Sequence, residues 1–188
     1  MRYGSRAWFN LTPDEIRLRR MRRQHENVSG LAVFEPADDG EASYLWRHMR
    51  EEERQETDET GCREEDHLLA IMRAERSFAV YHDDALLAIA TVVRMPDGRR
   101  LMSMERTVHA LERGHRFTWL KAYGPLSRTL TELVGDVVFV TPCDMPRALD
   151  VYRHAGAEQT GETVKVGGRE YWVLRLRQRK EDCDGDFL

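Results

Sequence analysis

Three strand-like runs in the middle of the chain constrain the fold most, because only short turns separate them. The runs are residues 78–81, 86–93 and 101–108. They are rich in β-branched, aromatic and other apolar residues, and turn residues at 82–84 and 96–98 divide them. Turns of this length cannot carry a crossover, so the sequence predicts three neighbouring antiparallel strands.

Helical patterns and further strands surround this meander in a definite order. A strand at 31–34 precedes two amphipathic helices, from Asp38 to Met49 and from His67 to Arg76, with a polar loop between them. After the meander come a long helix at 114–133, an apolar strand at 137–140, a helix at 145–155 and a hairpin of strands at 162–166 and 171–177. This order predicts the α/β (α+β) class, with a mixed, mostly antiparallel sheet flanked by helices.

The bulk properties fit one domain over residues 30–178. The chain has 188 residues, a mass of 22.0 kDa and 41% hydrophobic residues, enough for a core without disulfides. We expect a cytoplasmic protein without membrane contact, because the sequence has neither a run of about 18 apolar residues nor a signal-peptide pattern. Cys62, Cys143, Cys183 and the seven histidines are scattered, so we expect no metal site.

The two ends of the chain differ from this domain in composition. Residues 1–29 contain seven arginines and three acidic residues, and 14–26 is predicted to form an appended helix. Such an arm can bind the phosphates of nucleic acid, mediate contacts with other proteins, or simply be a solvated face. We expect it to pack apart from the core, and the polar residues 179–188 to form a tail.

The stretch from Ala148 to Ala157 has the most informative local pattern. Ala148, Tyr152 and Gly156 recur every four residues, which places the alanine and the phenol on one helix face and lets the glycine end the helix. Together with the order of elements, this stretch resembles the GNAT (acyl-CoA N-acyltransferase) superfamily over residues 31–178. The resemblance implies acetyl-CoA as cofactor, Ala148 on the helix face that meets it, and Tyr152 as the acid that protonates the departing thiolate. The alternative for Tyr152 is a half-buried aromatic without a chemical role.

The resemblance places a phosphate-binding loop before the long helix, at residues 111–116. The superfamily has small residues there, because main-chain N–H groups must approach the pyrophosphate closely. Here Gly114 fits, whereas Arg116 replaces the second small residue and His115 lies between them. Arg113 and Arg116 can pair with phosphate directly. We therefore expect a degraded loop that binds acetyl-CoA weakly, through side chains.

Glu105 is the candidate base that accepts the proton of an amine substrate. It lies on the predicted strand 101–108, on the face opposite Met102 and Met104, and its alternative reading is a solvated carboxylate. The acidic residues between Glu51 and Glu59 can attract a cationic amine, although such a run is commonly only a solvated surface.

A narrower resemblance is to the phage internal virion protein A family, whose members depart from the usual phosphate loop. It is carried by Met49-Arg50 before the acidic run, Glu105-Arg-Thr107, Tyr152-Arg-His-Ala-Gly156 and Tyr171-Trp172. It implies a phage or prophage origin and a place in the virion if the gene is phage-encoded. The alternative to an active enzyme is then a non-catalytic assembly protein, with phage structural proteins or DNA as partners.

Overall fold

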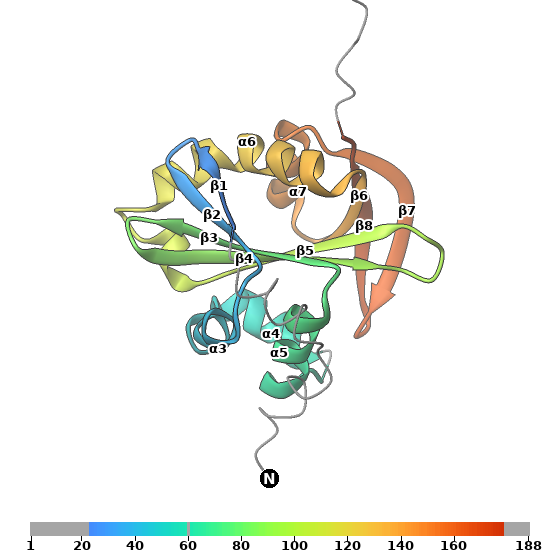
Figure 1. Ribbon diagram of the computed structural model, residues 1–188. Helices are drawn as coiled ribbons and strands as arrows, with labels where there is room; N and C mark the ends of the chain where they lie inside the picture. The colour runs from blue at the N-terminus through green and yellow to red at the C-terminus, as the bar shows by residue number, and fades with distance from the viewer. Residues whose placement is uncertain (1–22, 60, 179–188) are drawn as a thin grey trace, which may run out of the picture.

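An eight-stranded mixed sheet forms the centre of the protein (Figure 1). The computed structural model describes residues 23–59 and 61–178. The strands are β1 (Arg23–Val28), β2 (Leu31–Glu35), β3 (Arg76–His82), β4 (Ala85–Arg94), β5 (Arg100–Arg106), β6 (Val137–Pro142), β7 (Glu158–Val166) and β8 (Arg169–Leu176). They follow the order β1-β2-β3-β4-β5-β6-β8-β7, and every neighbouring pair is antiparallel except β5 and β6. The predicted meander is confirmed as β3, β4 and β5.

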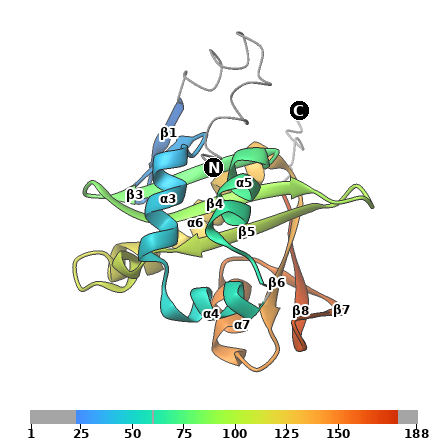
Figure 2. The same cartoon turned by 90° about the horizontal axis from the view of Figure 1, so that it is seen from below.

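Helices cover both faces of this sheet (Figures 1 and 2). On one face lie α3 (Asp39–His48), α4 (Glu51–Glu59) and α5 (Glu64–Arg73), and on the other α6 (Arg116–Val134) and α7 (Pro146–His154). A large apolar core with Phe78, Leu126 and Leu130 fills the space under α6. A smaller core with Leu45 and Ile71 lies under α3 and α5. The predicted α/β class and flanking helices are therefore confirmed.

The first strand corrects the expectation for the N-terminal arm. Residues 23–28 pair with β2, so the helix predicted over 14–26 does not reach its expected end, and the sheet begins before residue 30. A tight turn explains the difference, because Ser29 and Gly30 have φ values of 53° and 95° and return the chain onto β2. Val28 is buried in the main core. The rest of the predicted helix and the tail 179–188 lie outside the described residues.

The acidic segment after α3 is a helix, where the sequence predicted a polar loop. α4 has Glu51, Glu52 and Glu53 in its first turn, where negative charge interacts favourably with the helix dipole. Periodicity did not indicate this helix because it has no apolar residues. Its N-terminal turn is fixed instead by polar contacts with the end of β5, which are described below.

β5 and β6 are the two central strands that the candidate site requires. They are parallel and pair at Leu101 and Val138, and the described chain contains no further paired residues between them. β6 continues along β8 instead, while β5 continues to Arg106 and passes into the 3-10 helix η2 (Val108–Leu111). The carboxyl-terminal half of β5 therefore has one edge that β6 does not occupy.

Candidate active site

The end of β5 sends two adjacent charged side chains to opposite faces of the sheet. Glu105 is opposite Ile89 of β4, which belongs to the core under α3 and α5. Arg106 is opposite Ala88, which belongs to the core under α6. Because successive side chains of a strand alternate, one strand end contributes a carboxylate to one layer and a guanidinium to the other.

Glu105 is held by a buried histidine of α5. The Nε2 atom of His67 hydrogen-bonds Oε2 of Glu105. The His67 side chain is only 6% exposed, whereas that of Glu105 is 30% exposed. The indole of Trp46 packs on the imidazole with ring centres 5.2 Å apart, and the guanidinium of Arg54 lies 5.0 Å from the centre of the Trp46 ring. Glu105 thus has one fixed oxygen and still reaches solvent.

Arg106 lies on the other face, beside two tyrosines. Its Nε donates to Oε1 of Glu53, which projects from α4. The charge of Arg106 also acts on Tyr123 of α6 and Tyr152 of α7. The two tyrosine rings pack against each other, with ring centres 5.9 Å apart. Phe139 of β6 packs against Tyr152 at 4.9 Å between ring centres.

Burial controls the protonation of this cluster. Burial raises the pKa of Tyr123 well above its usual value, with a further increase from Tyr152 that the charge of Arg106 only partly offsets. Burial also raises the pKa of Glu53, although Arg106 acts in the opposite direction. Burial by itself would lower the pKa of Arg106, but the charge of Glu53 keeps that pKa raised. Tyr123 therefore stays protonated, and Arg106 stays cationic, near neutral pH.

The N-terminal turn of α4 occupies part of the free edge of β5. Met49 forms a β-bridge with Thr107, and the N–H of Arg50 donates to the carbonyl of Arg106 at 3.1 Å. The N–H of Arg106 donates to Oε2 of Glu53. These contacts bring α4 to the end of β5 and place Glu53 where its carboxylate meets the guanidinium of Arg106.

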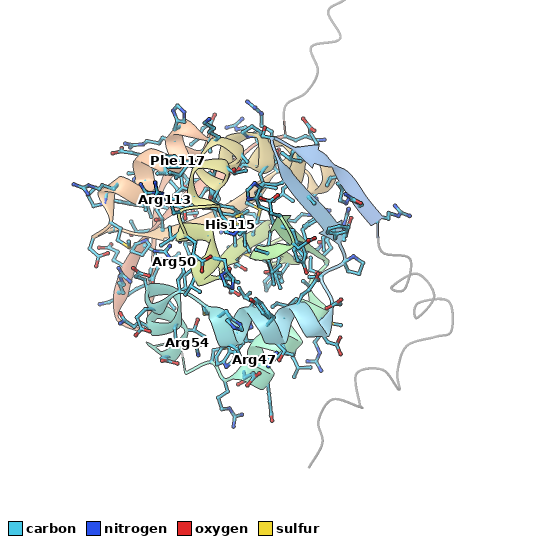
Figure 3. The ribbon with its side chains drawn as sticks, turned by 90° about the vertical axis from the view of Figure 1, so that its left-hand side faces the viewer. Arg47, Arg50, Arg54, Arg113, His115 and Phe117 are labelled. Atoms are coloured by element: carbon cyan, nitrogen blue, oxygen red, sulfur yellow. The ribbon has the colours of Figure 1, made fainter. Side chains whose placement is uncertain are left out.

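The predicted phosphate loop lies between η2 and α6. Figure 3 shows Arg113, His115 and Phe117 on the side of the molecule that also carries Arg50. Arg113 and Arg116 are exposed, as expected for side chains that are to meet phosphate. His115 instead hydrogen-bonds His82 of β3 through the two Nδ1 atoms, at 2.8 Å. Its contact in the structure is therefore with the sheet.

The turn at Gly114 has space for a ligand. A Cβ added at Gly114 would meet no atom within 4 Å. His115 precedes α6 without capping it by its side chain, and within the described chain the N–H groups of Phe117 and Thr118 have no hydrogen-bond acceptor. The N-terminus of a 19-residue helix with two free N–H groups is an anion-binding element.

α7 confirms the local geometry expected for residues 148–156. Ala148 and Tyr152 are both half-buried and lie one turn apart on the helix, which ends at His154. Gly156 has a φ of 95°, and the N–H of Ala157 donates to the carbonyl of Tyr152, so the glycine does terminate the helix. Tyr152 faces Arg106 and Tyr123, and Glu105 lies on the opposite face of the sheet.

The sequence analysis identified Glu105 and Tyr152 but not four other residues of the site. These are Glu53, His67, Arg106 and Tyr123. Glu53 belongs to an acidic run whose members look alike, and His67 was read only as part of an apolar helix face. The position of Arg106 could have been inferred from strand alternation, which sends its side chain to the face opposite that of Glu105.

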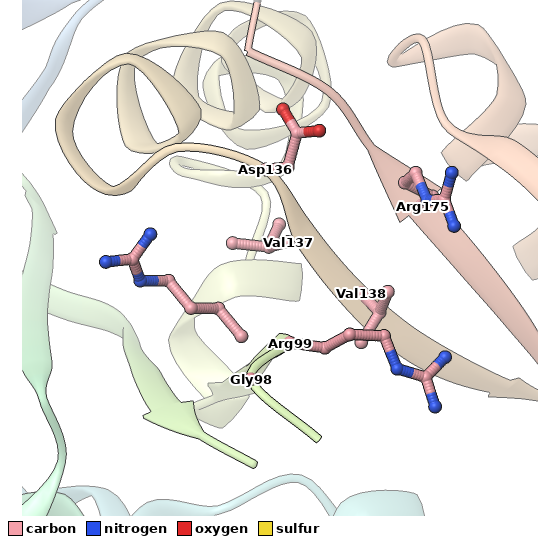
Figure 4. A pocket seen from close by; sticks show the side chains of 7 residues that line it. Gly98, Arg99, Asp136, Val137, Val138 and Arg175 are labelled. Carbon is pink, nitrogen blue, oxygen red and sulfur yellow. The ribbon is translucent and has the colours of Figure 1, made fainter. Parts of the chain in front are cut away.

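Other parts of the chain do not contribute to this site. A pocket of about 320 Å³ lies at the other end of β5, between Arg99, Arg175 and Asp136 (Figure 4). Within residues 23–59 and 61–178, no group of three or more His, Cys, Asp or Glu side chains is arranged to hold a metal ion. The helices of the described segments are all too short or too polar to span a bilayer.

The backbone of the protein is similar to those of several solved structures. No family model matches the sequence, and no curated protein sequence matches it. A spermidine N-acetyltransferase SpeG chimera from Vibrio cholerae and hSSAT has a similar structure, with a TM-score of 0.58 and 16% identity over 80% of this chain and 96% of that chain. A GNAT-family acetyltransferase from Bacillus anthracis has a TM-score of 0.56 at 10% identity, over 80% and 96% of the two chains. A GNAT-family acetyltransferase from Bacillus cereus has a TM-score of 0.54 at 13% identity, over 80% and 99%.

These neighbours agree with the broader of the two resemblances. They are acetyltransferases, and they lend no support to the phage internal virion protein A family, to a virion location or to a nucleic acid partner. At identities of 10–16% the likeness concerns the backbone. The chain has the fold of the GNAT acetyltransferases.

Proposed function

We propose that the protein transfers an acetyl group from acetyl-CoA to a cationic amine. One observation carries this proposal. A carboxylate that reaches solvent and a tyrosine next to a half-buried guanidinium lie on opposite faces of one strand end, where the two central strands part. An acyl transfer needs a proton acceptor on the side of the amine and a proton donor on the side of the departing thiolate.

In this scheme the ammonium group first releases one proton to solvent, and the neutral amine nitrogen then attacks the acetyl carbon. Glu105 accepts the second proton, which the nitrogen loses as it forms the new bond. Tyr152 donates its hydroxyl proton to the sulfur as the carbon–sulfur bond breaks. Arg106 stabilises the negative charge that develops on that side, and the ring of Tyr123 packs against that of Tyr152. The cofactor supplies the activated thioester.

The loop before α6 fits the phosphate end of this cofactor. The free N–H groups of Phe117 and Thr118 and the side chain of Arg113 would hold phosphate, and the space at Gly114 admits it. Tyr123 follows Arg116 by seven residues, or about 10 Å along the axis of α6. That separation lets the phosphate and the reacting carbonyl occupy different sites. We keep weak binding as part of the proposal, because Arg116 stands where a small residue is usual.

The charge around Glu105 supports a cationic acceptor. Nine carboxylates and two arginines lie between Glu51 and Asp66, on α4, α5 and the segment that joins them. Most of the described carboxylates in this segment are exposed, so their field raises the local concentration of cations. The spermidine N-acetyltransferase named above acts on such an amine, which makes spermidine the first acceptor to test.

The test is thiol release from acetyl-CoA in the presence of spermidine, a lysine-containing peptide amide or a simple alkylamine. We expect amine-dependent release by the wild type and at least a hundredfold slower release by Glu105→Gln. Lys165→Gln, on the exposed strand β7, is the control and should retain full activity. Equal rates for Glu105→Gln and the wild type would contradict the assignment of the base.

A further inference from the structure

His67 is the most deeply buried histidine among the described residues, yet the proposed chemistry does not use it directly. It lies on α5, and its ring is enclosed by the sheet and by Trp46. Its Nε2 contacts Glu105, while its Nδ1 is buried without a hydrogen-bond partner in the described chain. A buried polar atom without a partner is uncommon in folded proteins and calls for an explanation.

We propose that His67 is a positioning residue for Glu105, and this inference rests on the proposed acyl transfer. A neutral imidazole donates its Nε2–H to Oε2 of Glu105 and fixes the carboxylate at the end of β5. The structure contains no other hydrogen-bond partner for the Glu105 carboxylate within the described residues, so Oε1 stays available to the acceptor amine. The histidine itself is too buried to reach that amine.

The unpartnered Nδ1 determines the tautomer. With the proton on Nε2, Nδ1 has only a lone pair, and Nε2 points a donor at the carboxylate. The other neutral tautomer would oppose two lone pairs at the Glu105 contact and bury an unpaired Nδ1–H. A cationic imidazole would bury the same unpaired N–H together with a charge. The tautomer with the proton on Nε2 is the one that leaves only an acceptor without a partner.

Packing makes this donor stiff. Trp46 packs against the imidazole at a tilt, and the guanidinium of Arg54 covers the Trp46 ring and donates to the carbonyl of Trp46. The backbone of His67 is fixed in α5, where its N–H donates to the carbonyl of Arg63. Because α5 and Trp46 hold the His67 ring in place, its Nε2–H limits the positions that the Glu105 carboxylate can take. A carboxylate held in the productive position accepts a proton faster.

The experiment compares two substitutions of His67 in the full chain. His67→Gln keeps an N–H donor near the position of Nε2, whereas His67→Leu removes it. With acetyl-CoA and spermidine, we expect His67→Leu to lower kcat by about tenfold to a hundredfold, with KM for acetyl-CoA changed by less than about twofold. We expect His67→Gln to recover most of the lost kcat. A merely structural role would affect both variants in proportion to their thermal stability.

The matched control is His25→Gln. His25 also pairs with a carboxylate, Glu35, at 3.1 Å, but it lies on β1 away from the site. The substitution His25→Gln should therefore leave kcat unchanged. A second readout is independent of turnover: the ¹⁵N spectrum of the His67 ring should show a protonated Nε2 and an unprotonated Nδ1.

The outcomes separate the two proposals. Wild-type turnover that His67→Leu leaves unchanged, or that both variants reduce equally, overturns the positioning role and leaves the acyl transfer intact. A ring protonated at Nδ1 also overturns the positioning role. Absence of turnover by the wild type with all three amines overturns the proposed function, and the positioning role with it.

Discussion

Replacing Arg106 by methionine tests the cluster of charged residues and tyrosines that is proposed to protonate the departing thiolate. The substitution keeps the length and apolar part of the side chain and removes the guanidinium that pairs with Glu53. Glu53 is only 12% exposed, so its carboxylate would be left in a poorly solvated place. We expect the folded protein to lose stability, because a buried charge without its partner is costly.

The structure sets the size of this loss. Breaking a fully buried ion pair costs about 3–5 kcal/mol. Here Arg106 is 31% exposed, and Glu53 would keep the N–H of residue 106 and the guanidinium of Arg50, which lies 3.8 Å away. We therefore expect a loss of about 2–3 kcal/mol for Arg106→Met, and about 1–2 kcal/mol for Glu53→Gln, which keeps the shape and one acceptor.

The double variant and the pH dependence make the reasoning specific. If the loss comes from an unpaired carboxylate, Glu53→Gln should rescue Arg106→Met, with a coupling energy of at least about 1 kcal/mol. The pKa of Glu53 is raised by burial above 4.5, and removing Arg106 raises it further. A raised acid pKa means that protonation favours the folded state, so the deficit of Arg106→Met should shrink as the pH falls from 7 towards that pKa.

Urea unfolding at several pH values measures these quantities. With a slope of about 2 kcal/mol/M, the expected loss lowers the unfolding midpoint of Arg106→Met by about 1 M at pH 7. Arg177→Met is the control, because Arg177 also pairs through Nε with a carboxylate, that of Glu158, but both side chains are about 60% exposed. It should change stability by less than about 0.5 kcal/mol. Additive losses in the double variant, or a deficit independent of pH, would refute the argument.

Three further predictions concern the hydroxyl, the phosphate loop and acid stability. Tyr152→Phe should slow acetyl transfer at least tenfold while leaving the calorimetric affinity for acetyl-CoA almost intact, and equal turnover would return Tyr152 to a packing role. The double substitution Arg113→Ala/Arg116→Ala should weaken acetyl-CoA binding in calorimetric titration and reduce the salt dependence of that binding. Tight, salt-insensitive binding that the substitution leaves unchanged would contradict the idea of a degraded loop. Burial alone would raise the pKa of Glu35, but Arg76 and His25 together lower it, so these contacts contribute stability above about pH 4.5 that is lost as the pH falls. Glu35→Gln should flatten that loss in urea titrations between pH 5 and 3.

Local periodicity accounts for the parts of the fold that the sequence predicted. The strands from Phe78 to Val108 follow from short turns, and the end of α7 follows from Gly156, where the backbone needs a positive φ. α4 and β1 did not follow, because neither has a regular apolar face. Pairing with β2 overrides the charged, helix-like pattern of residues 23–26, and tertiary context commonly overrides such local preferences.

The candidate site was only partly predictable for a different reason. His67 contacts Glu105 across 38 residues, and Glu53 contacts Arg106 across 53. Spacing within one helix or strand cannot reveal such pairs, since it reports only which side chains share a face. A single sequence with many carboxylates offers several equivalent partners for each arginine, and the folded packing selects among them.

Thr107 fixes the register of β5, and this register decides the faces on which Glu105 and Arg106 lie. Its hydroxyl donates to the carbonyl of Leu86 at 2.7 Å, and its N–H donates to the carbonyl of Leu87 at 2.9 Å, so it fixes the end of β5 against β4. A slip of one residue would exchange the faces of Glu105 and Arg106. The carboxylate would then meet the tyrosines, and the guanidinium would meet His67. The buried threonine is thus as necessary to the proposed chemistry as the two charged residues that precede it, because it decides which face each of them reaches.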